Sequence, residues 1–141
     1  MNRVVSEARR WIGTPYVHQM AVQGAGCDCL GLVRGVWRGI VGSEPEVPPA
    51  YSMDWSETAG QERLWQAALR HLTPKPVDHA AAGDVILFRM KAGAVAKHLG
   101  IQSQIGPEPR FVHAYSGHGV VESALSVPWA RRIVARFEFP A

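Results

Sequence analysis

The composition of this chain predicts one globular domain over residues 1–141. The net charge is +3, with 47% hydrophobic and 19% charged residues, which excludes a disordered protein. The arginines and lysines are scattered along the chain, so we expect no direct binding to nucleic acid, whereas an anionic surface would suit the basic charge. No stretch of the sequence approaches the ~20 apolar residues of a membrane span.

The N-terminus and the cysteines bear on where the protein is made and used. Residues 1–10 carry charges where a signal peptide needs an apolar core. Cys27 and Cys29 are separated by one residue, so a disulfide between them would be strained. We therefore expect synthesis in the reducing cytoplasm and use there or inside an assembled particle, with another component delivering the protein to any target outside the cell.

Hydrophobic periodicity predicts helices in the first half of the chain. A first helix is expected over residues 4–12 and a second over residues 29–40. Residues 43–53 contain several prolines and predict a loop, and a third helix is expected over residues 56–72. In the second helix a glycine recurs at every fourth residue, at a cost of about 1 kcal/mol each relative to alanine. This spacing indicates either close approach of another backbone or simple tolerance at Gly31, Gly35 and Gly39.

The second half of the chain changes to short apolar runs separated by turn residues. These runs predict strands over residues 84–90, 98–103, 110–115, 120–123 and 133–137. Helices that are followed by consecutive strands indicate an α+β fold class, in which the N-terminal helices pack on a small antiparallel sheet.

A cysteine nucleophile is the chemistry that the residues favour. Cys29 stands at the predicted start of a helix, where unpaired backbone N–H groups stabilise a thiolate. His98 and His113 lie on neighbouring predicted strands, so their side chains can meet on one face of an antiparallel sheet. In that arrangement His98 takes the thiol proton and His113 holds the imidazole in the required tautomer. Three loop residues could line a substrate groove, with surface or core packing as the alternative: Trp55, His118 and Trp129.

Two other interpretations of the cysteines stay open. Cys29 could be a buried thiol without chemistry. Cys27, Cys29 and His18 could belong to a zinc site, although structural zinc ligands usually come as C-x₂₋₄-C pairs with a second pair elsewhere, and this sequence has neither. We therefore expect no metal and no organic cofactor, and no chemical role for Cys27.

Five short motifs follow one another along the chain: Gly13-Thr14-Pro15-Tyr16, Asp28-Cys29-Leu30-Gly31-Leu32, Gly83-Asp84-Val85, His98-Leu99-Gly100-Ile101 and Val112-His113-Ala114. In this order they resemble the NlpC-type cell-wall peptidases, and in particular the phage-encoded branch found among tail genes, including those of gene transfer agents. The resemblance implies a papain-like cysteine peptidase fold, in which a helix carries the cysteine and a small antiparallel sheet carries the histidines.

The resemblance also implies roles for individual residues. Cys29 matches the nucleophile, His98 the general base, and His113 the residue that orients the base. Tyr16 matches the tyrosine near the oxyanion side of the site. Asp28 matches the aspartate before the cysteine, where a structural role and a substrate role are both open. Gly83-Asp84 looks like an architectural turn at the start of a core strand.

The resemblance also implies a function. The protein would be a peptidase that cuts amide bonds in the stem peptides of peptidoglycan, most typically between D-glutamate and a diamino acid. Other tail or baseplate proteins are the expected partners, in a phage-like particle that opens the cell wall locally. Leu30 stands where many cellular members have serine, so the substrate contact of that serine is not carried over. Two alternatives remain: a structural tail plug or adaptor that keeps the peptidase fold, and a thiol amidase or acyltransferase with another substrate.

Overall fold

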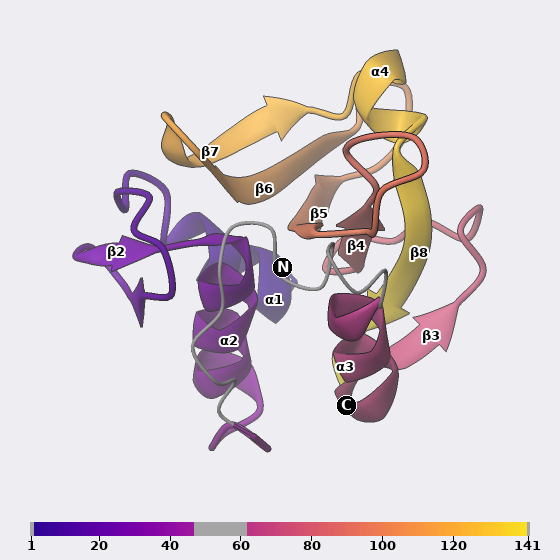
Figure 1. Cartoon of the computed structure of the whole chain (residues 1–141). Helices are drawn as coiled ribbons and strands as arrows, with labels where there is room; N and C mark the ends of the chain where they lie inside the picture. The colour runs from indigo at the N-terminus through magenta and orange to yellow at the C-terminus, as the bar shows by residue number, and fades with distance from the viewer. Residues whose placement is uncertain (1, 47–61, 141) are drawn as a thin grey trace.

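Three helices cover one face of an antiparallel sheet in the computed structural model, which describes residues 2–46 and 62–140, and a fourth, short helix packs on the other face (Figure 1). The helices are α1 (Arg3–Arg9), α2 (Cys29–Ile40), α3 (Arg63–His71) and α4 (Val127–Ala130). The strands are β1 (Ala21–Val22), β2 (Gly26–Cys27), β3 (Thr73–Lys75), β4 (Val85–Phe88), β5 (His98–Gln104), β6 (Arg110–Tyr115), β7 (Gly119–Ala124) and β8 (Ile133–Glu138). None of these helices has the length and apolar character needed to cross a bilayer.

The main sheet has the strand order β3-β8-β4-β5-β6-β7, and every neighbouring pair is antiparallel. Alternate residues of β4 face opposite sides, as the pleat of a strand requires. Val85 and Leu87 pack towards α2 and α3, whereas Ile86 and Phe88 pack with Phe111 on the other face. The predicted α+β fold, with N-terminal helices on a small antiparallel sheet, is therefore confirmed.

Most helix and strand boundaries agree with the periodicity of the sequence. Helix α1 is the exception, because it ends at Arg9, three residues before its predicted end, and residues 10–12 continue in turns. Helix α2 and strand β6 have the predicted bounds. The ends of β4, β5, β7 and β8 differ from the predicted ends by at most two residues. Helix α3 starts at Arg63 and ends one residue before the predicted end. The predicted helical residues 56–61 lie outside the described part of the chain, as does Trp55.

Strand β3 is an element that the sequence analysis missed, because it is short and its central residue is Pro74, which disfavours a strand in the middle of a sheet. Residues Thr73–Lys75 instead pair with β8 at the edge of the sheet. Proline is tolerated at an edge, where one side of the strand needs no ladder hydrogen bond. The short helix α4 and the two-residue strands β1 and β2 were missed as well, because they lack a repeating apolar pattern.

The Gly83-Asp84 pair has the architectural role that the resemblance implied. Gly83 adopts a φ of 94°, in the left-handed region that favours glycine. The Asp84 carboxylate is buried and forms an ion pair of 3.0 Å with the buried guanidinium of Arg136 on β8. Lys75 of β3 approaches the same carboxylate at 3.1 Å, so Asp84 joins β3 and β8 to the start of β4, at the opposite end of β4 from Phe88, the cross-strand neighbour of His98.

Two of the helical glycines are explained by close approach. A Cβ atom at Gly31 would overlap the backbone carbonyl oxygen of Met20, and one at Gly35 would overlap the ring of Trp11. At Gly39 the nearest atom is the side-chain carboxyl carbon of Glu7, at 2.6 Å, and that flexible side chain can move. Close packing of Met20, in the loop before α2, and of Trp11, in the turn after α1, therefore requires Gly31 and Gly35.

Replacing Gly35 by alanine should destabilise the protein, because the added methyl group meets the buried Trp11 ring. We expect Gly35→Ala to lower the free energy of unfolding by about 2 kcal/mol. The matched control, Gly39→Ala, should raise it by up to about 1 kcal/mol through helix propensity. Urea denaturation measures both variants, and equal effects would contradict this explanation of the glycine pattern.

Candidate active site

Asp28 fixes the start of α2 and thereby the position of Cys29. Its Oδ1 atom accepts a hydrogen bond of 2.7 Å from the backbone N–H of Gly31, which caps the helix. Its Oδ2 atom accepts another of 2.7 Å from the N–H of Gln19, a residue held at a φ of 69°. The side chain is buried, so these contacts correspond to the structural role that the sequence left open for Asp28.

The Cys29 thiol lies against the backbone on both sides of His98. The sulfur donates to the Lys97 carbonyl oxygen at 3.6 Å, and the backbone N–H of Leu99 also interacts with it. The strand start that carries His98 therefore borders the start of helix α2. In this resting arrangement the hydrogen bond of the thiol goes to a carbonyl oxygen.

The environment of Cys29 favours a neutral thiol. Burial, and then the negative charge of Asp28, raises the pKa of Cys29 to about 12. Backbone N–H groups of Cys29, Leu30 and Leu99 act in the opposite direction but are outweighed. The backbone N–H groups at the helix start thus favour the thiolate, as expected, but burial and the charge of Asp28 outweigh them, so the resting thiol is neutral.

His98 and His113 are brought together as the strand pattern predicted. Nε2 of His98 and Nδ1 of His113 are joined by a buried hydrogen bond of 2.8 Å. Burial, and then the neighbouring imidazole, lowers the pKa of His98 to about 3, while burial followed by His118 lowers the pKa of His113 to about 4. Both rings are thus neutral at neutral pH, and Nδ1 is the nitrogen of His98 that remains for proton transfer.

The second nitrogen of His113 has a partner that the sequence analysis did not name. Nε2 of His113 lies 3.0 Å from the Oγ atom of Ser123 on β7. Val121 is the direct cross-strand neighbour of His113, so Ser123 lies two residues further along, on the same face of the sheet. Only the strand register could have identified it, because no motif contains this serine.

Aromatic side chains enclose the histidine pair. The Trp129 ring lies 5.5 Å from the His98 ring and 5.1 Å from the His113 ring, measured between centroids. Tyr115 stacks on His113 at 5.4 Å, and the exposed His118 stacks on Tyr115 at 5.2 Å. Of the loop residues named above, Trp129 therefore covers the histidines, and His118 stands at the outer end of this stack.

Tyr16 and Cys27 lie beside the start of α2. Tyr16 forms an isolated bridge with Cys27, and its pKa is raised to about 12 by burial, followed by Cys29 and Asp28. Its hydroxyl is therefore a protonated donor near the thiol. The Cys27 side chain is fully buried in the core cluster that also contains Leu32. Within residues 2–46 and 62–140, no group of three or more His, Cys, Asp or Glu side chains is arranged to hold a metal ion.

Glu62 anchors the loop that leads into His98. One carboxylate oxygen accepts a hydrogen bond of 2.7 Å from the N–H of Ala96, and the other forms an ion pair of 2.9 Å with Arg89. Because Lys97 follows directly, these contacts hold the carbonyl group that receives the Cys29 thiol.

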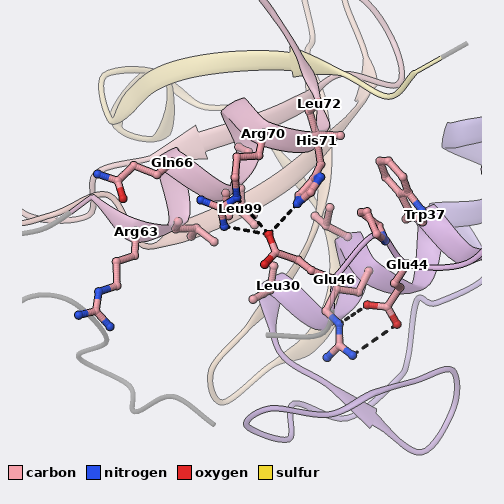
Figure 2. Close-up of a pocket in the computed structure, with 16 residues that line it drawn as sticks. Leu30, Trp37, Glu44, Glu46, Arg63, Gln66, Arg70, His71, Leu72 and Leu99 are labelled. Atoms are coloured by element: carbon pink, nitrogen blue, oxygen red, sulfur yellow. Dashed lines mark hydrogen bonds and ion pairs between the residues drawn. The ribbon is translucent and has the colours of Figure 1, made fainter. Parts of the chain in front are cut away.

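A pocket of about 420 Å³ lies between α2 and α3 (Figure 2). Glu46 at its rim forms ion pairs with Arg70 at 2.8 Å and with His71 at 2.6 Å. Leu30 and Leu99 line the pocket next to Cys29 and His98, but none of the five predicted site residues is among the described residues that line it. The pocket is thus a neighbour of the site rather than its centre.

The fold and the site define a papain-like α+β domain, in which the cysteine at a helix start contacts the backbone that flanks His98, and His98 is hydrogen-bonded to His113. The chain belongs to the NlpC/P60 family, whose model matches residues 13–137.

Solved structures share this fold. The NlpC/p60 domain of the peptidoglycan hydrolase SagA has a TM-score of 0.65 and 24% identity, and the match covers 99% of this chain and 100% of that domain. A lipoprotein-like NLP/P60 family protein of Staphylococcus aureus has a TM-score of 0.63 and 24% identity, with 99% of this chain and 41% of that one covered.

Two curated relatives are similar over most of this chain. The murein DD-endopeptidase MepS/murein LD-carboxypeptidase of Escherichia coli K12 is 28% identical over 142 residues, which cover 96% of this chain. The gamma-DL-glutamyl hydrolase of Bacillus subtilis 168 is 30% identical over 123 residues, or 87% of this chain. The chain spans 64% of the length of the first and 25% of the second.

The buried histidine pair should make stability depend on pH. Histidines in the unfolded chain have a pKa near 6.5. Between about pH 6.5 and 4 the unfolded chain therefore binds protons that the folded chain does not. As a result, the free energy of unfolding falls as the pH falls through this range. We expect each imidazole to contribute a slope of about 1 kcal/mol per pH unit in this range.

Urea denaturation at several pH values, applied to the wild type and to His98→Gln with His113→Gln, tests this expectation. The double variant should show the shallower dependence on pH. His79→Gln is the control, because that side chain is 68% exposed, and it should keep the wild-type slope. Identical slopes in all three proteins would contradict the buried neutral pair.

Proposed function

We propose that this protein is a cysteine peptidase that hydrolyses amide bonds in the stem peptides of peptidoglycan. The observation that carries the proposal is the hydrogen-bonded pair of His98 and His113, with the backbone on both sides of His98 in contact with the Cys29 thiol, in a domain of the NlpC/P60 family. The murein endopeptidase and the gamma-DL-glutamyl hydrolase among its relatives support this class of substrate.

In the proposed reaction, the neutral Cys29 thiol gives its proton to Nδ1 of His98 as the sulfur attacks the scissile carbonyl carbon. The imidazolium that forms at His98 is stabilised by its hydrogen bond to His113. The proton then passes to the leaving amine as the C–N bond breaks, which gives a thioester on Cys29. Water attacks the thioester, with His98 as the base, and regenerates the thiol.

The oxyanion of the tetrahedral intermediate needs hydrogen-bond donors that are already in place. The backbone N–H of Cys29 at the helix start and the hydroxyl of Tyr16 are the proposed donors. A pKa of about 12 keeps the Tyr16 hydroxyl protonated throughout the neutral range. Each donor of this kind commonly contributes about 3 kcal/mol to transition-state stabilisation.

The bond between D-glutamate and a diamino acid is the proposed cleavage point. The ordered motifs suggest it, and the name of the Bacillus subtilis relative, a gamma-DL-glutamyl hydrolase, is compatible with it. The same motifs suggest the setting: a component of a phage-like tail, made in the cytoplasm and positioned by tail or baseplate proteins. Detecting the chain in purified tail particles tests that setting.

Two matched cysteine variants test the catalytic proposal. Cys29→Ala should abolish the release of peptide fragments from purified peptidoglycan, measured by mass spectrometry, while circular dichroism shows an unchanged fold. Cys27→Ala should keep the activity, because that side chain packs in the core. The fragment masses identify the bond that is cut.

Other outcomes separate the alternatives. Equal loss of activity in both variants would contradict a specific role for Cys29 and point to a structural role of the cysteine pair. A wild-type protein that is folded and releases no fragment would contradict the peptidase proposal and favour a structural plug or adaptor. Transfer of an acyl group to an acceptor other than water would favour the amidase or acyltransferase alternative.

A further inference from the structure

We propose that Ser123 is a positioning residue that sets the tautomer of the histidine pair and so leaves Nδ1 of His98 able to accept the thiol proton. The inference rests on the proposed function, since it concerns how His98 acts as a base. It adds a third strand to the site: His98 comes from β5, His113 from β6 and Ser123 from β7.

The three side chains form one continuous chain of hydrogen bonds. His98 Nε2 and His113 Nδ1 are 2.8 Å apart, and His113 Nε2 and Ser123 Oγ are 3.0 Å apart. His113 is only 1% exposed, so bulk water has little access to replace a missing partner. Ser123 is itself partly exposed, which lets its hydroxyl hydrogen turn towards solvent.

Two arrangements of protons satisfy these hydrogen bonds. In the first, His98 Nε2–H donates to His113 Nδ1, His113 Nε2–H donates to the Ser123 oxygen, and Nδ1 of His98 carries a lone pair. In the second, the Ser123 hydroxyl donates to His113 Nε2, His113 Nδ1–H donates to His98 Nε2, and Nδ1 of His98 carries the proton. Only the first arrangement provides a base.

The first arrangement needs an acceptor at residue 123. Without one, the Nε2–H group of His113 would be buried and unpaired, which is costly, whereas a bare ring nitrogen costs less. The pair would then shift to the second arrangement, in which His98 has no free nitrogen for the thiol proton. Ser123 therefore acts on the reaction through His113 and not by touching the substrate.

Kinetics of peptidoglycan-fragment hydrolysis test the role of Ser123. We expect Ser123→Ala to lower kcat by about ten- to a hundredfold with an unchanged KM, because the loss of one buried partner shifts the tautomers. Ser123→Thr keeps the hydroxyl and should restore kcat. The control is Ser103→Ala on β5, where the lost hydroxyl contact is with Glu122 at 2.7 Å, and its kcat should equal that of the wild type. Wild-type kcat in Ser123→Ala would overturn the inference.

Nitrogen NMR of labelled histidines gives a readout that does not depend on activity. At about pH 7 the wild type and Ser123→Thr should carry the proton of His113 on Nε2, and Ser123→Ala should carry it on Nδ1. If the wild type hydrolyses nothing, the proposed function fails, while this tautomer shift still supports the effect of Ser123 on the pair. An identical tautomer in wild type and Ser123→Ala would overturn the inference in either case.

Discussion

Two imidazoles share one buried hydrogen bond, between Nε2 of His98 and Nδ1 of His113, and the surrounding structure is arranged to hold it. It forms because β5 and β6 are neighbours in an antiparallel sheet. Gly100 also matters, since a Cβ atom there would come within 2.7 Å of the Phe111 ring, and that ring packs 4.1 Å from the ring of His113. Gly100 thus leaves space for the Phe111 ring, which packs against His113.

The burial that orders this pair also decides its charge. Enclosure by Trp129 and its aromatic neighbours removes water from both rings, and a buried imidazole without a carboxylate partner is more stable neutral than charged. The same desolvation keeps the Cys29 thiol protonated. The thiol and both imidazoles are therefore neutral in the resting structure, which does not contain a thiolate–imidazolium pair.

Asp28 connects this chemistry to the architecture of the helix. Its two carboxylate oxygens hold the N-terminus of α2 and the turn at Gln19, so the sulfur is placed by a cap that the sequence carries directly before the cysteine. The carboxylate has a second effect, because its charge raises the pKa of the thiol that it positions. One side chain thus both positions Cys29 and adds to the rise in its pKa that burial causes.

The sequence predicted the elements whose residues repeat with a regular period. Apolar spacing located α2 with Cys29 at its start, and short apolar runs located the strands of His98 and His113. It could not predict Ser123, whose relation to His113 depends on the register of β6 against β7, nor β3, which exists only through pairing with β8. The sequence could not predict the protonation of Cys29 either, because desolvation depends on which atoms pack around the sulfur in the folded chain.

The ionisation of Cys29 tests the account most directly. The ultraviolet absorbance of the thiolate can be followed with pH in the wild-type protein, with Cys29→Ala as the reference that removes this one thiol. We expect no thiolate signal from Cys29 between about pH 5 and 9, because the pKa of this thiol is raised to about 12. A thiolate signal from Cys29 that persists through this range would show a preformed ion pair and contradict the neutral site.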